Sequence, residues 1–172
     1  MDQPDRKHAQ PTPTAPTTKG VARLMLTSLD FDERQPIPKR HASKPEGDNV
    51  APRIEWAGAP EGTKEFALVV DDPDASGSTP WVHWIVHGIS GKARRLGGDV
   101  REGIEGRNDF GEEGWGGPMP PLGGGVHRYR FHLFALDAPI SVAARASKDS
   151  LLEAMRGHVI GEGELVGTYE RR

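Results

Sequence analysis

Two apolar stretches decide the fold: EFALVVDDPD at positions 65–74 and WVHWIVHGI at positions 81–89. Apolar residues occupy both alternating faces of residues 65–71 and of residues 81–89, which is typical of central strands covered on both sides. We therefore expect these two segments to lie side by side. Asp72 stands where the first strand runs into a proline-containing turn, so its carboxylate is expected at a sheet edge or pocket rim.

Further strands are expected around this pair. Residues 128–136 resume a strand in which alternate positions share one apolar face, namely Tyr129, Phe131, Leu133 and Ala135. A short final strand is predicted at Glu164–Tyr169. The apolar positions of Val21–Leu29 suit either a strand or a helix.

One helix is expected towards the C-terminal end. Ser147 or Ser150 is predicted to cap it, with Glu153 at capping-box spacing from Ser150 and Gly157 at its end. The apolar stripe of this helix consists of Leu151, Leu152 and Met155. Many strands with one clear helix predict a mainly β protein with minor α, arranged as a sandwich.

Three segments show no regular pattern. Residues 1–20 contain almost no apolar side chains and are predicted to form a disordered tail. Residues 35–52 are punctuated by proline and are expected to form a long surface loop without core residues. Residues 97–125 are so rich in glycine that we expect an irregular connection held by packing. The rest of the chain, residues 21–172, is predicted to be a single domain.

Composition excludes several classes of function. The net charge of −3 comes from 25 acidic and 22 basic residues that are interspersed, so no basic patch indicates a nucleic-acid partner. The chain has no cysteine, which excludes disulfides, thiolate metal sites and thiol catalysis, and suits a reducing compartment. No apolar run has the length of a membrane span and no secretory signal is recognisable, so we expect no integral membrane association and a cytoplasmic location.

Three polar residues are candidates for a binding site. Asp72 ends a strand, His83 lies among tryptophans, and His127 follows a run of glycines at the start of a strand. Glycines let backbone N–H groups approach a ligand closely, and prolines such as Pro121 form a stiff wall. If the three residues converge, the carboxylate favours protonated or well-oriented imidazoles, which donate hydrogen bonds to phosphate, sulfate or carboxylate oxygens.

Other interpretations of the same residues stay open. His83, with Trp81, Ile85 and His87 on its expected face, suits a buried core histidine with two hydrogen bonds. Asp72 and Asp74 each suit an Asx turn, an interpretation weaker for Asp72 because it lies nearer the strand end, and Asp74 also suits a structural pair with Arg128. Two histidines and one aspartate are also a possible zinc-ligand set, but the spacing of His83 and His87 lacks the glutamate and the helix of a metalloprotease.

The chain resembles the phosphatidylethanolamine-binding protein family, specifically its bacterial Raf-kinase-inhibitor-like branch. The similarity extends from Asn49 to the end of the chain in the order of the family's motifs. The motifs are Asn49-Val50-Ala51-Pro52, Asp72-Pro73-Asp74-Ala75, Trp81-Val82-His83-Trp84, Gly106-Arg107-Asn108-Asp109-Phe110-Gly111, Gly116-Gly117-Pro118-Met119-Pro120-Pro121, Gly125-Val126-His127-Arg128-Tyr129 and Glu164-Leu165-Val166-Gly167-Thr168-Tyr169. Ser76 departs from the family's motif, where a rim proline is usual.

The resemblance implies a β-sandwich of antiparallel sheets with a small cavity at one end that binds phosphate-like anions, including phospholipid head groups. On this sequence it implies a cavity lined by Asp72, His83 and His127. Its remaining wall is implied to come from Gly117, Met119, Pro121 and Tyr129.

Three functions follow from these observations. The first is non-enzymatic binding of a small anionic or phosphorylated ligand, because no activated nucleophile, nucleotide loop or cofactor motif is present. The second is a regulatory protein interaction of the kinase-inhibitor type, which fold resemblance alone does not establish. The third is metal-assisted hydrolysis. The resemblance also leaves a homodimer open, whereas the protein partner stays unknown.

Overall fold

The centre of the fold is the antiparallel pair of β4 (Glu65–Asp72) and β5 (Trp81–Ser90), as their two apolar faces predict. β4 pairs on its other side with β8 (His127–Leu136), and β8 pairs with β9 (Val159–Tyr169). Because neighbouring antiparallel strands run in opposite directions, the end of β4 and the starts of β5 and β8 meet at the same end of the sheet.

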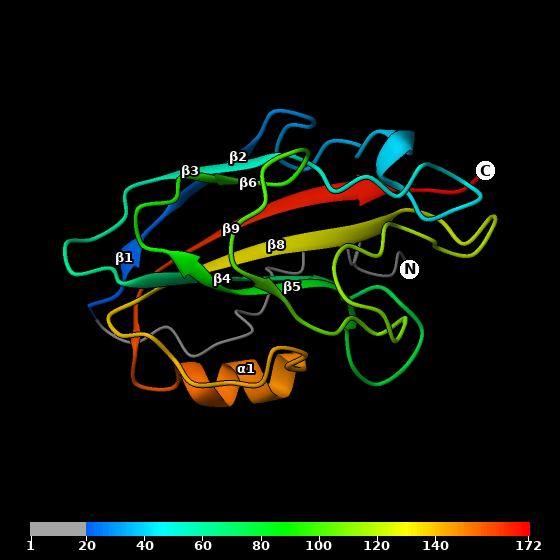
Figure 1. Ribbon diagram of the computed structural model, residues 1–172. Coiled ribbons are helices and arrows are strands. Elements are labelled where there is room, and N and C mark those ends of the chain that lie inside the picture. The colour runs from blue at the N-terminus through cyan, green and yellow to red at the C-terminus, as the bar shows by residue number, and fades with distance from the viewer. Residues whose placement is uncertain (1–19) are drawn as a thin grey trace, which may run out of the picture.

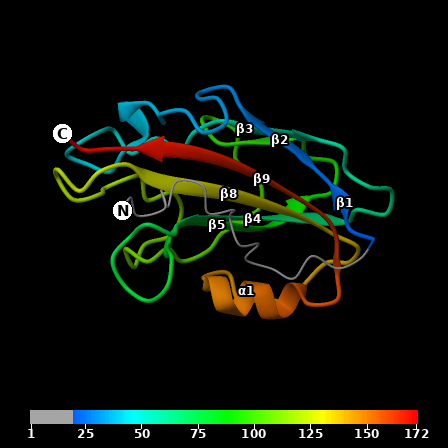
Figure 2. The same ribbon diagram turned by 180° about the vertical axis from the view of Figure 1, so that it is seen from behind.

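The computed structural model describes residues 20–172, and Figures 1 and 2 show it from opposite sides. The larger sheet has the strand order β1-β9-β8-β4-β5-β7, and the smaller sheet has the order β2-β3-β6. The remaining elements are β1 (Ala22–Arg23), β2 (Met25–Ser28), β3 (Ile54–Ala57), β6 (Arg95–Leu96), β7 (Ile104–Glu105) and the helix α1 (Lys148–Met155).

The smaller sheet and α1 cover opposite faces of the larger sheet (Figures 1 and 2). Trp56 of β3 packs with Phe66 in the core between the two sheets, which also contains the predicted apolar face of β8. On the other face, Leu151 and Met155 of α1 pack into a second core with Ile85. The predicted mainly β sandwich is confirmed, and its sheets are antiparallel except for the parallel pair of β1 and β9.

β5 contains a bulge in its pairing with β4. Val70 pairs with Trp84, whereas the next residue, Asp71, pairs with Val82. His83 is therefore the additional residue of β5 at this step. A bulge bends the strand and changes the direction of the side chain at the extra position.

The bulge overturns one prediction from simple alternation. His83 contacts Tyr129, a member of the core between the two sheets, whereas Ile85 belongs to the core under α1. Nε2 of His87 donates to the carbonyl oxygen of Ala144, in the connection that leads to α1. The prediction that His83 shares a face with Ile85 and His87 is wrong, because alternation is interrupted between them.

The segment 35–52 is not the coreless surface loop that its prolines predict. Ile37 and Ala42 are buried in the core between the sheets, with exposed fractions of 2% and 0%. A short 3-10 helix, η2 (Lys39–His41), lies in this segment. The prediction failed because these apolar residues are isolated between polar ones, so no periodic pattern reveals them.

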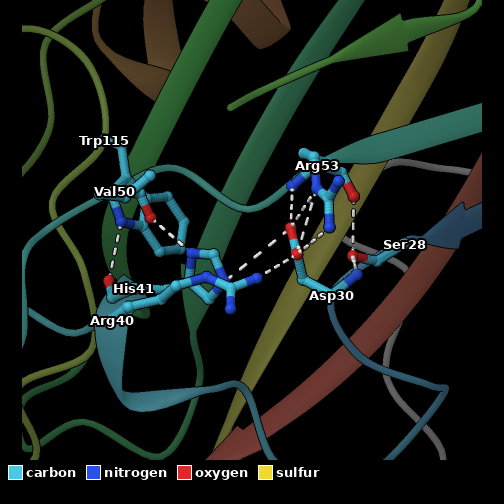
Figure 3. A network of polar contacts seen from close by, with 7 residues as sticks. All are labelled: Ser28, Asp30, Arg40, His41, Val50, Arg53 and Trp115. Carbon is cyan, nitrogen blue, oxygen red and sulfur yellow. Dashed lines mark hydrogen bonds and ion pairs between the residues drawn. The ribbon is translucent and has the colours of Figure 1, made fainter. Parts of the chain in front are cut away.

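The buried carboxylate of Asp30 connects the chain after β2 to Arg40 in this segment and to Arg53 just after it. Figure 3 shows Asp30, whose side chain is 1% exposed, between the guanidinium groups of Arg40 and Arg53. Its oxygens also accept a hydrogen bond from the backbone N–H of Arg53 at 2.7 Å. Burial by itself raises the pKa of Asp30, but the hydrogen bonds and charges of its partners lower it to about 2.

The remaining secondary structure agrees with the sequence in kind but not always in extent. Val21–Leu29 contains two strands, and the final strand starts at Val159 rather than at Glu164. Ser147, not Ser150, caps α1 by accepting a hydrogen bond from the Ser150 backbone N–H. Residues 97–125 are mainly irregular but contain β7. The predicted tail, apart from Gly20, lies outside the described residues.

Candidate functional site

Asp72 and His127 form a buried pair where β4 ends and β8 begins. The distance between His127 Nδ1 and Asp72 Oδ2 is 2.7 Å, and the two residues are 7% and 3% exposed. Because a carboxylate only accepts, Nδ1 of His127 carries the proton of this bond. The other carboxylate oxygen accepts from the backbone N–H of Asp74 at 2.7 Å. Both oxygens of Asp72 therefore have partners, and His127 retains Nε2 for a further contact.

His83 is held in one orientation by the loop that follows β7. Its Nδ1 lies 2.5 Å from the carbonyl oxygen of Gly116, and the N–H of Gly116 donates to the His83 carbonyl at 2.8 Å. A carbonyl oxygen accepts only, so Nδ1 of His83 donates. Burial lowers the pKa of His83, against the opposing effects of this hydrogen bond and of the nearby Asp72 charge.

Two aromatic rings flank His83. The ring of Tyr129 is 5.1 Å away between centroids, and that of Phe110 is 5.5 Å away, both with their planes tilted strongly against the imidazole. Tyr129 is fully buried, and its hydroxyl group has no hydrogen-bond partner within residues 20–172. Burial, together with the charges of Asp72 and Asp74, raises the pKa of Tyr129. The hydroxyl group is therefore an uncharged donor beside the two imidazoles.

Gly117 forms a backbone wall next to His83. Its N–H donates to the side-chain oxygen of Asn49 at 2.7 Å, and its carbonyl accepts from the Ser43 hydroxyl group at 2.8 Å. A Cβ atom at Gly117 would lie 2.0 Å from the carbonyl oxygen of His41. Only glycine permits this close approach, so segment 38–50 fixes the wall that carries Gly116 and Gly117.

The sequence analysis gave no role to three residues of this arrangement. Asn49 adopts a left-handed conformation, with φ of 56°, and holds Gly117 and the Trp115 carbonyl through its side-chain amide. Ser43 holds the Gly117 carbonyl, and Phe110 lies against His83. An asparagine before a turn is the available signal for Asn49, because asparagine tolerates positive φ better than most residues.

The other two predicted wall residues lie less close to the polar cluster. Met119 is half-buried and Pro121 is exposed. Within residues 20–172, neither makes a hydrogen bond with Asp72, His83 or His127. Their part in a binding site stays a prediction.

Asp74 forms the predicted structural pair with Arg128. Its carboxylate accepts from the backbone N–H of Arg128 and from the Arg128 guanidinium group, each at 2.9 Å. Burial opposes ionisation, but the hydrogen bonds from Arg128 hold the pKa of Asp74 below its ordinary value. This pair connects the turn after β4 to β8 and keeps Asp72 and His127 at the same end of the sheet.

The arrangement provides no ligand set for a metal ion. Among residues 20–172, no group of three or more histidine, aspartate or glutamate side chains is placed to hold one. In particular, the oxygens of Asp72 are occupied by His127 and by the N–H of Asp74.

A cavity of about 750 Å³ lies elsewhere, along β1, β2 and β9. Its ionisable lining consists of three carboxylates, one arginine and one histidine, namely Glu33, Glu162, Glu164, Arg23 and His132. Burial raises the pKa of Glu164, so ionisation of this carboxylate is unfavourable. Because the carboxylates outnumber the arginine, this cavity suits an anion less well than the cluster of Asp72, His83 and His127 does.

The sequence of the chain matches known proteins over the same range. A sequence model described as phosphatidylethanolamine-binding protein matches residues 27–170. The chain belongs to this family. A relative from Methanothermobacter thermautotrophicus, named UPF0098 protein, is 41% identical over 155 residues, which cover 86% of this chain and 99% of the relative.

Solved structures of family members have the same fold. Escherichia coli YbcL, described as a member of the mammalian phosphatidylethanolamine-binding protein family, is 33% identical, with a TM-score of 0.80. The match covers 87% of this chain and 99% of YbcL. The homologue CT736 from Chlamydia trachomatis is 35% identical, with a TM-score of 0.79, and the match covers 90% of this chain and 100% of CT736.

Membership of the family does not fix the cellular compartment. A relative from Mycobacterium tuberculosis that is 40% identical over 149 residues, covering 86% of this chain and 72% of the relative, is named as a lipoprotein, LppC. Within residues 20–172, no helix is both long enough and apolar enough to cross a membrane.

Proposed function

We propose that the chain is a non-enzymatic binding protein for a small anionic or phosphorylated ligand of the phosphate or phospholipid head-group type. The ligand is proposed to bind between Asp72, His83, His127 and Tyr129, against the backbone of Gly117. The observation that carries the proposal is the partnerless, fully buried hydroxyl group of Tyr129 beside two buried imidazoles. A buried donor without a partner costs free energy, which a ligand acceptor recovers.

The charges of the cluster support an anion more than a neutral ligand. When His127 is protonated, it donates from Nδ1 to the carboxylate of Asp72 and presents a second N–H at Nε2. A charged donor of this kind forms short, strong hydrogen bonds to phosphate oxygens. The prolines around Gly117 supply no N–H groups, and the N–H groups of Gly116 and Gly117 already donate to His83 and Asn49, so the donors that remain for a ligand are on side chains.

Calorimetric titration with methyl phosphate tests this function. We expect wild-type protein to bind at millimolar or lower concentration, and His127→Ala and Tyr129→Phe to bind at least about tenfold more weakly, because each loses a donor to the ligand. His158→Ala is the matched control, since it removes an imidazole from an exposed pair with Asp137. Wild-type protein that does not bind at about ten millimolar would contradict the proposal.

Three further statements belong to the proposal. The absence of cysteine suits a cytoplasmic location. The cluster contains no activated nucleophile, which favours binding over catalysis. The resemblance leaves a homodimer open, and light scattering during size-exclusion chromatography measures the oligomeric state. The regulatory alternative requires a protein partner whose binding depends on His127, which a pull-down with wild-type and His127→Ala protein examines.

A further inference from the structure

We infer that His83 selects ligands that carry their own hydrogen-bond donor. The preferred ligand is a singly protonated phosphate monoester, and a fully deprotonated anion of the same shape is disfavoured. This inference rests on the anion-binding function proposed above, and it goes further by assigning opposite hydrogen-bonding roles to the two histidines of the site.

The hydrogen bond to Gly116 determines which nitrogen of His83 carries the proton. A carbonyl oxygen lies 2.5 Å from Nδ1, so Nδ1 must donate. In the neutral imidazole, the other nitrogen, Nε2, then has a lone pair and no proton. The reciprocal hydrogen bond from the Gly116 N–H to the His83 carbonyl holds the two residues together, which disfavours rotation of the ring to the other tautomer.

Nε2 of His83 is available to a ligand. Within residues 20–172 this atom has no hydrogen-bond partner. It also keeps some access to solvent, unlike the buried partnerless atoms of the core. His83 is only 3% exposed, and the ring of Tyr129 lies beside its imidazole. Solvent or a ligand therefore has little access to the ring other than at Nε2. A group that binds there meets an acceptor, not a donor.

The surroundings of His83 favour the neutral ring. Phe110 and Tyr129 flank it with apolar ring surface, and burial lowers its pKa. The charged groups that face it from β4 are Asp71 and Asp72, which act in the opposite direction with smaller effect. Asp71 is engaged with Arg130 and Lys148, and Asp72 with His127, so the negative charges nearby are already matched.

His127 has the opposite role. Its Nδ1 donates to a carboxylate rather than to a neutral carbonyl, and a carboxylate stabilises the charged imidazole. When charged, His127 presents an N–H at Nε2. The site thus offers an acceptor at His83 and, when His127 is charged, a donor at Nε2 of His127. A phosphate monoester with one proton matches both, because its P–OH group donates to Nε2 of His83 while its other oxygens accept from His127.

Methyl phosphate and methyl sulfate separate this selection from simple charge attraction. They have similar shapes, but methyl phosphate loses its second proton with a pKa of about 6, whereas methyl sulfate is a monoanion without a donor. At about pH 5.5 we expect calorimetry on wild-type protein to give at least about tenfold tighter binding of methyl phosphate. At about pH 8 this preference falls, because methyl phosphate has lost the donor. At about pH 5.5 both ligands carry about one negative charge, so charge attraction to His127 affects them alike and cancels in the ratio.

A variant assigns the preference to His83. In His83→Gln the side-chain amide can offer an N–H group to the ligand, so the preference at about pH 5.5 is expected to fall to within about threefold. His87→Gln is the control on the same strand, since His87 contacts Ala144 and not the site, and its ratio is expected to match that of wild-type protein. Thermal unfolding of both variants checks that they are folded.

The outcomes distinguish the two proposals. Equal affinities of wild-type protein for the two ligands at about pH 5.5, or a preference that grows towards about pH 8, contradict the selection by His83 and leave anion binding intact. Failure of both ligands to bind contradicts anion binding and the selection together. An unchanged ratio in His83→Gln assigns the preference to another residue and overturns the inference.

Discussion

Asp71 and Asp72 are adjacent on β4 and equally buried, with exposed fractions of 3%, but they have partners of different kinds. Asp71 accepts from Arg130 at 2.8 Å and from Lys148 at 2.8 Å, and so connects β4 to β8 and to the start of α1. Asp72, at the end of the strand, has an imidazole as its ion-pair partner.

The difference separates a structural carboxylate from a functional one. Arginine and lysine are charged at every pH at which the protein is folded, so the Asp71 charge is always matched. The imidazole next to Asp72 has one nitrogen in a hydrogen bond with the carboxylate, and its other nitrogen stays available. A buried charge with two cationic partners holds the fold together, whereas a buried charge with an imidazole partner orients a binding group.

The largest expected effect comes from Asp71→Asn. The substitution removes the carboxylate that Arg130 and Lys148 both contact, and breaking a buried pair of this kind costs about 3–5 kcal/mol of unfolding free energy. Urea unfolding followed by circular dichroism measures the loss. Methyl phosphate is expected to bind any folded Asp71→Asn protein as it binds the wild type, because Asp71 does not contact the ligand.

Asp149→Asn is the control for this change, because the same chemistry takes place at an exposed residue in the first turn of α1. It is expected to cost less than about 1 kcal/mol, from the weaker interaction with the helix dipole. If Asp71→Asn is too unstable to purify, Lys148→Met removes one cation and leaves Arg130 in place. Equal stability of Asp71→Asn and Asp149→Asn would contradict the structural role of the buried cluster.

Asp30 extends the comparison, because it also lies near a histidine. Its oxygen is 3.9 Å from Nε2 of His41, but Arg40 and Arg53 already match its charge (Figure 3). Burial lowers the pKa of His41, and its Nδ1 donates to the Val50 carbonyl. Proximity of a carboxylate to an imidazole therefore does not make a functional pair when arginines neutralise the carboxylate first.

The stabilisation that ionised Asp30 contributes is expected to be lost in acid. The pKa of Asp30 is about 2 in the folded protein and 3.8 ordinarily, so the stabilisation is complete above the ordinary value and is lost as pH falls through the folded value. This difference corresponds to about 2 kcal/mol of unfolding free energy. Urea unfolding between about pH 5 and about pH 2 should show the wild type losing this stabilisation relative to Asp30→Asn. Curves that stay parallel would contradict it.

The sequence revealed the strands that hold the site because their pattern is strong. Residues 65–71 and 81–89 are apolar on both faces, and β8 alternates from Arg128 to Leu133, so period and length agree. The positions of Asp72 and His127 at strand ends followed from the same pattern. The family resemblance then supplied the expectation that these ends meet around an anion.

Features that depend on contacts distant in sequence were not predictable in this way. The bulge at His83 adds one residue to β5 without any glycine or proline to announce it, so alternation placed the ring on the wrong face. Asp30 can be buried because Arg53 pairs with it, and Arg53 is 23 residues away, immediately before β3. Likewise, Asn49 holds Gly117 across 68 residues, and nothing local marks that contact.

Asp72→Asn is the smallest change and compares most directly with Asp71→Asn. The amide oxygen still accepts from the Asp74 N–H, and the amide N–H₂ group can donate to Nδ1 of His127 in its other neutral tautomer. The fold therefore keeps its hydrogen bonds, and the loss of unfolding free energy is expected to be below about 2 kcal/mol. His127 loses the carboxylate that accepts from Nδ1 and orients its ring, so methyl phosphate is expected to bind about tenfold more weakly at neutral pH, measured by calorimetry. A variant that binds normally but unfolds as easily as Asp71→Asn would reverse the roles assigned to the two carboxylates.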